Sequence, residues 1–229
     1  MRIAVIITAA GMGTRLGWNM PKALVPLAGR TLIERALEGV RDSGIANQII
    51  VTIPAGTYDH FHRLVGDGVK LVVGGATRQE SVAHGLDAVR SGTDVILVHD
   101  AARCMTPAQV FRRVAEAVSA GHPGVIPAIP VTDTIKSVET GNDIEPVLTT
   151  FDRSTLRAVQ TPQGFDAQVL RSAHEMTWPG TEGAPDDGAL VEASGHEVVL
   201  VKGADLSMKI TTELDMKLAE LLLGSGSWT

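Results

Sequence analysis

Several features that mark particular protein classes are scarce in this chain of 229 residues. Cys104 is the only cysteine, which excludes an internal disulfide and a zinc site built from several cysteines, and it fits a cytoplasmic location. Aromatic residues make up 3% and the formal net charge is −6, so neither base stacking nor phosphate neutralisation favours nucleic-acid binding. No apolar run reaches about 18 residues, so no membrane-spanning segment is predicted.

The chain does contain short apolar runs that alternate with helical patterns. The runs at 3–7, 48–53, 70–73, 95–98 and 124–129 predict buried strands. Between them, Thr31 with Glu34 and Thr77 with Glu80 predict capping boxes that start helices, and residues 106–109 suggest a third. This alternation predicts a single α/β domain over 1–229, with a Rossmann-like, mostly parallel sheet and helices on both faces.

The pattern changes after about residue 130. Residues 133–138 and 144–150 read as two extended segments around a turn at 140–143, which predicts a protruding β-arm at about 133–150. A helical pattern follows near 166–176, then a loop at 178–188, a strand at 196–201 and a last helix that starts at Thr212 with Asp215. The end, 224–229, is predicted to be a flexible tail.

A glycine-rich loop follows the first strand and carries Gly11, Gly13 and Gly17. Small residues there let the backbone approach a ligand, and backbone N–H groups can point at phosphates, although a plain strand-to-helix turn also needs glycine. Leu16 stands where a dinucleotide fingerprint needs its third glycine, and the loop lacks the spacing of a Walker motif. Its two cations, Arg15 and Lys22, suit a polyphosphate.

Asp100 follows the very apolar run 95–98, at the predicted carboxyl end of a strand. Ligands of open α/β sheets gather at such ends. An aspartate there can hold Mg²⁺, bind a substrate hydroxyl, or cap the next helix. His99 beside it is predicted to be packed rather than to bind a ligand.

Segments spread over nearly the whole chain carry a resemblance to a known family. They are AAGMGTRLGWNMPKALVPLAGRTLIE, GGATRQESVAHGL, LVHDAAR, PVTDTIK, FDRSTLRAVQTPQGF and LVKGADLSMKITTELDMKLAE. In order and spacing they resemble the 2-C-methyl-D-erythritol 4-phosphate cytidylyltransferases, of the sugar-nucleotide nucleotidyltransferase superfamily. The resemblance implies transfer of a cytidylyl group from CTP to this polyol phosphate in non-mevalonate isoprenoid biosynthesis, with release of pyrophosphate and with Mg²⁺ as cofactor.

The resemblance also implies a set of site residues. The catalytic ones are Arg15, Lys22, Arg153 and Lys209, and those that bind the nucleotide are Ala9, Ala10, Gly11, Gly13, Thr14, Gly75, Arg78, Ser81, Asp100 and Ala101. Those that bind the polyol phosphate are Asp100, Arg103, Thr134, Arg153, Thr161 and Lys209, and Asp100 is also the candidate metal ligand. The arm would swap across a homodimer and deliver Arg153 to the neighbouring site.

Two alternatives remain at this point. A ribitol-5-phosphate cytidylyltransferase would run the same reaction on a different polyol, and the departures from the family pattern at Pro185 and Ser207 bear on that choice. The departure at Ala76 concerns a contact to the nucleotide instead. A noncatalytic nucleotide-binding protein would have the same fold. Against it speaks the joint presence of the candidate site residues Arg15, Lys22, Asp100, Arg153 and Lys209.

Overall fold

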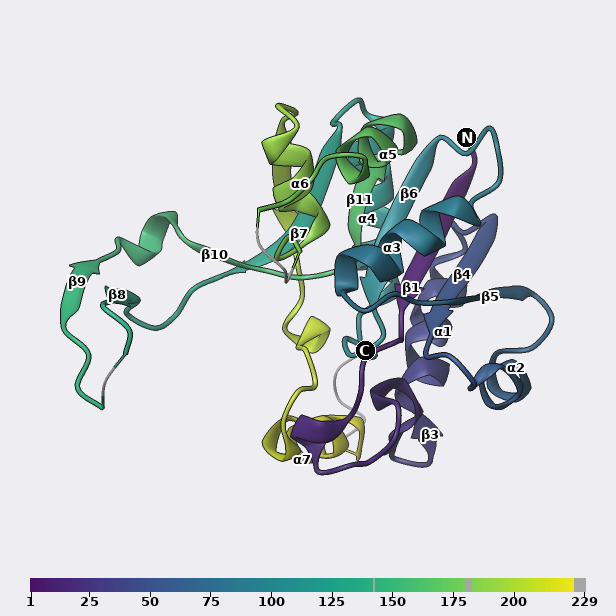
Figure 1. Ribbon diagram of the computed structural model, residues 1–229, viewed down its shortest axis with the longest axis horizontal. Helices are drawn as coiled ribbons and strands as arrows, with labels where there is room; N and C mark the ends of the chain where they lie inside the picture. The colour runs from purple at the N-terminus through teal and green to yellow at the C-terminus, as the bar shows by residue number, and fades with distance from the viewer. Residues whose placement is uncertain (142, 180–182, 225–229) are drawn as a thin grey trace.

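The computed structural model describes residues 1–141, 143–179 and 183–224, with the side chain of Arg15 left out. At the centre of this part of the chain lies an eight-stranded sheet with helices on both faces (Figure 1). Its strands run in the order β5 (Val69–Val73), β4 (Gln48–Ile53), β1 (Ile3–Thr8), β6 (Val95–Asp100), β11 (Gln163–Asp166), β7 (Gly124–Pro130) and β12 (Val198–Lys202). The short strand β10 (Arg157–Val159) pairs with the same edge of β7 as β11 does, further along β7. The predicted α/β fold with a mostly parallel sheet is confirmed.

Strand β1 lies between β4 and β6 and is parallel to both. The register pairs Thr8 with Thr52 of β4 on one side and with Asp100 of β6 on the other. The three strands therefore end at one edge of the sheet, where the glycine-rich loop begins. The antiparallel strand β11 between β6 and β7 is a difference from the prediction, since its four residues are too few to show a pattern.

Two apolar layers form the core, one on each face of the sheet. Helices α1 (Leu32–Ser43), α2 (Tyr58–Val65) and α4 (Ala108–Ser119) cover one face, and α3 (Arg78–Asp87), α5 (Ala167–His174) and α6 (Asp187–Ala193) cover the other. Alternate residues of β1 serve the two layers, since Val5 packs into the first and Ile6 into the second. None of the described helices has the length and apolarity that a membrane crossing requires.

The capping boxes predicted for α1 and α3 are confirmed, whereas the one predicted for α4 is wrong. Thr31 and Glu34 form a reciprocal capping box at α1, and Thr77 and Glu80 form another at α3. The box expected at residues 106–109 is absent from the described structure of α4, because the Thr106 hydroxyl instead donates to the Arg103 carbonyl at 2.8 Å. The loop predicted at 178–188 was also too long, since α6 begins at Asp187 with Asp186 as its cap.

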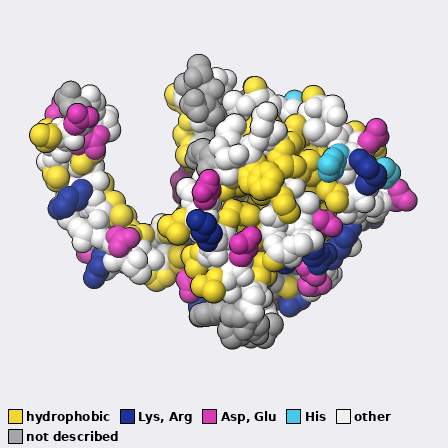
Figure 2. All heavy atoms as spheres, turned by 90° about the horizontal axis from the view of Figure 1, so that it is seen from below, with side chains coloured by type: hydrophobic (Ala, Val, Ile, Leu, Met, Phe, Trp, Pro, Cys, Tyr) yellow, Lys and Arg dark blue, Asp and Glu magenta, His cyan; other side chains and the backbone are white. Residues whose placement is uncertain are grey.

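The predicted arm stands well clear of the body in two perpendicular views (Figures 1 and 2). It is built on the antiparallel pair β8 (Lys136–Val138) and β9 (Val147–Thr150), followed by a short helix, η3 (Arg153–Thr155). Its apolar side chains have little to pack against, since Ile144 is 86% exposed and Leu148 is 65% exposed. Residue 142 of the predicted turn and residues 225–229 of the predicted tail lie outside the described residues.

A third apolar cluster fixes the segment after β1. Two short helices, η1 (Thr14–Leu16) and η2 (Lys22–Leu24), are followed by a small hairpin of β2 (Pro26–Leu27) and β3 (Arg30–Thr31). Helix η4 (Asp205–Ser207) and the last helix, α7 (Glu213–Gly224), complete the chain, and Ile210 and Ala219 pack there against Leu16 and Leu27. The predicted start of α7 is confirmed, because the Asp215 N–H donates to Thr212 and Asp215 accepts from the Thr212 N–H.

Candidate active site

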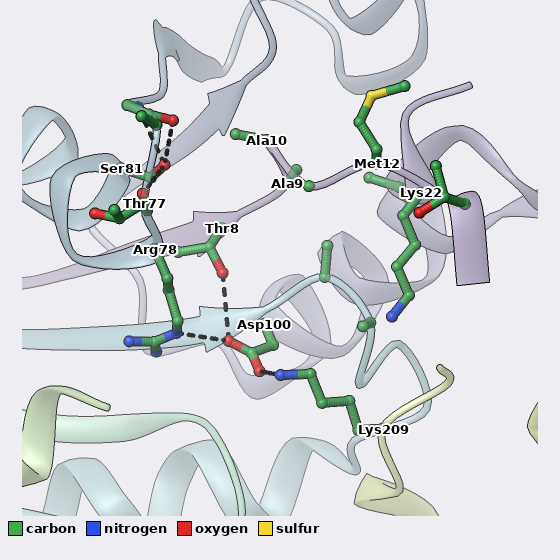
Figure 3. A pocket seen from close by; sticks show the side chains of 17 residues that line it. Thr8, Ala9, Ala10, Met12, Lys22, Thr77, Arg78, Ser81, Asp100 and Lys209 are labelled. Atoms are coloured by element: carbon green, nitrogen blue, oxygen red, sulfur yellow. Dashed lines mark hydrogen bonds and ion pairs between the residues drawn. The ribbon is translucent and has the colours of Figure 1, made fainter. Parts of the chain in front are cut away.

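A cavity of about 430 Å³ opens where β1 and β6 end (Figure 3). Three parts of the chain surround it: the loop after β1, the start of α3, and the segment after β6, with Lys209 reaching in from the stretch before α7. Its lining residues are Thr8, Ala9, Ala10, Gly11, Met12, Thr14, Lys22, Ala23, Gly75, Ala76, Thr77, Arg78, Ser81, Asp100, Ala101, Ala102 and Lys209. A polar pocket at this edge of an α/β sheet is the expected place for a ligand.

The glycine-rich loop is folded back on itself by its own backbone. The Gly13 N–H donates to the Met20 carbonyl and the Lys22 N–H donates to the Gly11 carbonyl, both at 2.9 Å. A Cβ atom at Gly13 would lie 3.0 Å from the Met20 oxygen, so glycine permits this close approach. As a result the side chain of Lys22 extends into the cavity from the side opposite α3 (Figure 3).

Two further glycines allow close packing just before α3, one against this loop and one against α3 itself. A Cβ atom at Gly74 would lie 2.6 Å from the Ala10 Cβ, and one at Gly75 would lie 2.2 Å from the Glu80 Cβ. The Gly75 N–H donates to the Ser81 hydroxyl at 3.1 Å, which makes Ser81 a support of the cavity wall. Because Gly75 has no side chain, its backbone faces the cavity here.

Asp100 is the centre of charge in the site. Its Oδ1 atom accepts from the Arg78 Nε and from the Thr8 hydroxyl, both at 3.3 Å, and its Oδ2 atom lies 2.9 Å from the Lys209 Nζ (Figure 3). Burial by itself would raise the pKa of Asp100, but the charges of Arg78 and Lys209 outweigh it and hold the pKa well below its usual range. Asp100 is therefore a carboxylate at neutral pH.

Arg78 lies between two carboxylates. Its Nη1 atom donates to Asp187 at 2.7 Å while its Nε donates to Asp100. Burial would lower the pKa of Arg78, but the two aspartates raise it above its ordinary value. The guanidinium is thus a permanent positive charge in the cavity wall, balanced on both sides.

The structure brings most of the predicted site residues together, but not all of them. Those that line the cavity are Ala9, Ala10, Gly11, Thr14, Lys22, Gly75, Arg78, Ser81, Asp100, Ala101 and Lys209. Gly13 is buried within the loop, and the side chain of Arg15 lies outside the described part of the chain. Thr134 and Arg153 lie on the exposed arm and its base, where Arg153 donates to the Thr132 carbonyl.

Two other predicted residues support the site from behind. The Thr161 hydroxyl accepts from the Asp100 N–H at 3.0 Å and lies 2.9 Å from the His99 Nδ1. Arg103 donates to the backbone carbonyls of Ser207 and Val159, so it ties the segment before Lys209 to β10 instead of lining the cavity.

His99 is packed, as predicted. It is fully buried with its ring edge against Phe111, and burial lowers the pKa of its imidazole to about 4. The neutral ring therefore supports the site as a packed hydrogen-bonding group.

The sequence interpretation missed Thr8 and Asp187. Thr8 could have been found from its place at the end of a strand beside the one that ends in Asp100. No local pattern pointed to Asp187, because it meets Arg78 across 109 positions of sequence.

Comparisons with known proteins agree on one family. The family model described as 2-C-methyl-D-erythritol 4-phosphate cytidylyltransferase matches residues 3–225. Proteins of that name from Rhodococcus jostii and Saccharopolyspora erythraea are 43% and 44% identical; the matches cover 98% and 97% of this chain and 96% and 100% of theirs. The solved enzyme of that name from Thermus thermophilus is 36% identical, with a TM-score of 0.78 over 97% of this chain and 98% of that one. A 4-diphosphocytidyl-2C-methyl-D-erythritol synthase from Anaerococcus prevotii is 28% identical, with a TM-score of 0.84 over 97% and 96% of the two chains.

Proposed function

The chain belongs to the 2-C-methyl-D-erythritol 4-phosphate cytidylyltransferase family, and we propose that its reaction takes place in the 430 Å³ cavity at the end of β1. The enzyme transfers a cytidylyl group from CTP to 2-C-methyl-D-erythritol 4-phosphate, a step of non-mevalonate isoprenoid biosynthesis. The products are 4-diphosphocytidyl-2-C-methyl-D-erythritol and pyrophosphate. The observation that carries the placement is a cavity lined by Lys22, Arg78 and Lys209, in which Arg78 and Lys209 both contact the carboxylate of Asp100.

The reaction needs charge balance more than it needs a base. A phosphate oxygen of the polyol phosphate forms a bond to the α-phosphorus of CTP, and the bond from that phosphorus to the pyrophosphate oxygen breaks. A phosphate monoester has a second pKa near about 6, so the nucleophile is already mostly dianionic at neutral pH. The protein therefore has to hold several phosphates close together in line and neutralise the charge that grows on the leaving group.

The positions of the two lysines suit that task. Lys22 enters the cavity from the glycine-rich loop, and Lys209 enters near Asp100 (Figure 3). We assign Lys22 to the α-phosphate and the leaving pyrophosphate, and Lys209 to the phosphate of the polyol. Arg15 shares the loop with Lys22 and is assigned to the same phosphates by the family resemblance.

The opposite wall suits the nucleoside. Gly75 exposes backbone there, Ser81 fixes that backbone, and Arg78 contributes a guanidinium held by two carboxylates. We assign Gly75, Arg78 and Ser81 to holding the cytidine part of CTP.

Mg²⁺ is the proposed cofactor, with Asp100 as its protein ligand. Mg²⁺ is commonly held by one or two carboxylates together with substrate phosphates and waters, and Asp100 is an ionised carboxylate in the cavity. Within the described residues no group of three or more His, Cys, Asp or Glu side chains forms an all-protein metal site, which agrees with a metal shared with the triphosphate. Bound there, the ion would offset phosphate charge and orient the triphosphate.

We further propose a homodimer in which the arm completes the partner's site. Arg153 and Thr134 lie at the base and on the arm of this chain and outside its own cavity, and Ile144, Val147 and Leu148 expose apolar surface on the same arm. A two-fold interface uses the same surface on both subunits, so each arm would serve the other chain. We also propose a cytoplasmic location, which a chain with a single cysteine, Cys104, fits.

A pyrophosphate-release assay tests this function. Purified protein is given CTP or ATP, with either methylerythritol phosphate or ribitol 5-phosphate, in the presence of Mg²⁺ or excess chelator. We expect release only with CTP, methylerythritol phosphate and Mg²⁺. Turnover that is equal with ATP contradicts the nucleotide assignment, turnover in chelator contradicts the metal, and a preference for ribitol phosphate contradicts the polyol.

A further inference from the structure

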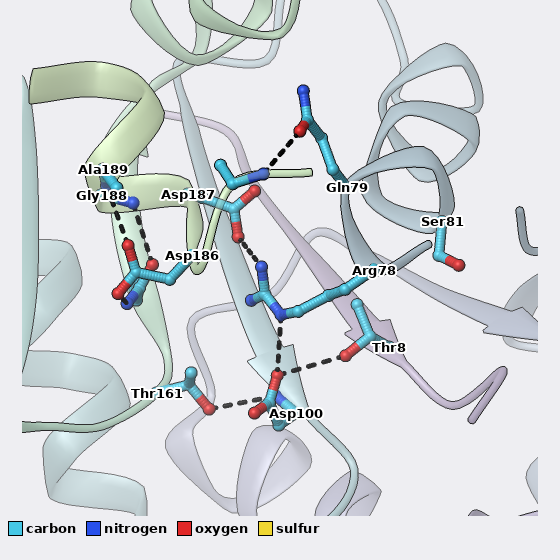
Figure 4. A network of polar contacts seen from close by, with 12 residues as sticks. Thr8, Arg78, Gln79, Ser81, Asp100, Thr161, Asp186, Asp187, Gly188 and Ala189 are labelled. Atoms are coloured by element: carbon cyan, nitrogen blue, oxygen red, sulfur yellow. Dashed lines mark hydrogen bonds and ion pairs between the residues drawn. The ribbon is translucent and has the colours of Figure 1, made fainter. Parts of the chain in front are cut away.

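We propose that Asp187 and His174 form a buried positioning pair that orients Arg78 toward the nucleotide and limits its contact with Asp100. The inference rests on the proposed role of Arg78 in holding CTP. Neither residue of the pair is among those that line the cavity, so both would act through Arg78. Figure 4 shows Arg78 reaching from α3 to Asp187 at the start of α6 and to Asp100 at the end of β6.

The contacts form a continuous chain into the cavity. The His174 Nε2 lies 2.9 Å from the Asp187 Oδ1, and the Asp187 Oδ2 accepts from the Arg78 Nη1 at 2.7 Å. The Arg78 Nε then donates to Asp100 at 3.3 Å, the longer of its two carboxylate contacts. The shorter contact is therefore the one outside the cavity.

Burial and the neighbouring charge of Arg78 set the protonation states of Asp187 and His174. The side chain of Asp187 is 1% exposed and that of His174 is 5% exposed. Burial would raise the pKa of Asp187, but the charge of Arg78 and the hydrogen bond from His174 lower it, so Asp187 is a carboxylate and only accepts hydrogen bonds. The His174 Nε2 must consequently carry a hydrogen and donate it, which fills one carboxylate oxygen and leaves the other for Arg78.

This arrangement explains why the guanidinium does not turn wholly toward Asp100. Arginine and carboxylate groups often pair through two parallel hydrogen bonds, and Asp100 offers such a partner. Asp187 takes the Nη1 atom instead, so Asp100 keeps its Oδ2 atom for Lys209. If the pair were lost, Arg78 would be free to close on Asp100 and leave the place where we expect the nucleotide.

The histidine can be tested without removing either charge. The change His174→Leu deletes the donor to Asp187, whereas His174→Gln keeps an amide Nε2 the same number of bonds from the backbone. We expect His174→Leu to raise the KM for CTP about tenfold, the scale of one lost hydrogen bond to a charged group, with kcat changed less than twofold. His174→Gln should restore most of the affinity, and the KM for the polyol phosphate should stay constant.

A double-mutant cycle tests whether the effect passes through Arg78. In an Arg78→Met background, which already has a raised KM for CTP, adding His174→Leu should raise it no further. The matched control is His84→Leu, which removes an exposed histidine from the helix that carries Arg78. We expect that control to have wild-type kinetics, and thermal melts establish that each variant is folded at the assay temperature.

The outcomes separate this inference from the proposed function. A wild-type protein without cytidylyl transfer would overturn the function itself. With an active wild type, an unchanged KM for CTP in His174→Leu overturns the positioning role. A lower kcat at constant KM also overturns it, because that result indicates a smaller amount of active protein rather than weaker binding of CTP. If the KM effects of His174→Leu and Arg78→Met multiply, His174 acts independently of Arg78 and the inference is wrong.

Discussion

Replacing Asp100 by asparagine is the perturbation that most directly probes the centre of the site. Asparagine has the same shape but no charge, and its amide nitrogen cannot accept a hydrogen bond. Arg78 keeps Asp187 as its second carboxylate partner, whereas the Lys209 Nζ loses an acceptor at 2.9 Å. The change therefore tests how much the charge of one buried carboxylate contributes to the fold.

The magnitude follows from the three contacts of Asp100. The charge-assisted bond with Arg78 contributes about 1.5–3 kcal/mol. Lys209 is 44% exposed, so solvent screens its pair with Asp100 and its contribution is at most about 1 kcal/mol. Asparagine keeps an amide oxygen that can accept from Thr8 and from the Arg78 Nε, which share the Oδ1 atom of Asp100, so only part of the Arg78 contribution is lost. The expected loss in the free energy of unfolding is then about 1–3 kcal/mol. For a chain of this size that corresponds to a Tm lower by roughly 2–12 °C.

The assay is thermal and urea unfolding of the wild type and of Asp100→Asn, first at pH 7.5 and then at falling pH. The control is Asp67→Asn, whose side chain is 99% exposed. Because the pKa of Asp100 is lowered in the folded protein, its stabilisation is complete above the pKa of the unfolded chain, near about 4, and is lost as the pH falls toward the folded value. The difference between the two proteins should therefore be constant above about pH 5 and shrink below pH 4. Equal stability at pH 7.5, or a difference that grows in acid, would refute the reasoning.

Three further predictions concern the loop, the arm and the turn before α3. Lys22→Ala should lower kcat about 10²–10³-fold with a smaller change in the KM for CTP, because the charge on pyrophosphate grows in the transition state; steady-state kinetics would contradict this if only the KM rose. Mixing Lys22→Ala chains with Arg153→Ala chains should restore activity, since one site of the mixed dimer then carries both defects and the other carries neither; inactive heterodimers would rule out a site shared in this way. Gly75→Ala should displace Glu80, whose Cβ would lie 2.2 Å from the new methyl group, and the resulting loss of the α3 cap should lower the free energy of unfolding by about 1 kcal/mol. The control in urea unfolding is Gly68→Ala, where a new methyl group meets open space, and equal stability of the two variants would contradict the role of Gly75 in the cap.

Much of the secondary structure could be predicted because its causes are local. Strand β1 has apolar side chains on both of its faces, and such a strand is stable only between two layers of helices. The box of Thr31 and Glu34 satisfies backbone N–H groups within one turn, so four residues of sequence suffice to predict it. Where a competing bond exists the local signal fails, as at Thr106, whose hydroxyl bonds to the Arg103 carbonyl.

Short or weakly patterned elements were missed for a related reason. Helix α2 buries only Phe61 and Val65 among the residues described for it, which is too few to show a helical period. Strand β11 has four residues and pairs antiparallel with both neighbours, an arrangement that depends on the chain returning between two strands already in place. These elements are stabilised by the surfaces they meet, and those surfaces exist only in the folded chain.

The kind of site could be predicted from local sequence: a glycine-rich loop with cations after the first strand, and an aspartate at the end of another. The pairing of the charges depends on the folded chain, because Arg78 meets Asp187 across 109 positions and Lys209 meets Asp100 across a similar span. A motif records which residues are present, whereas the strength of a charge contact depends on distance and burial, and both are set by how the strands and helices pack.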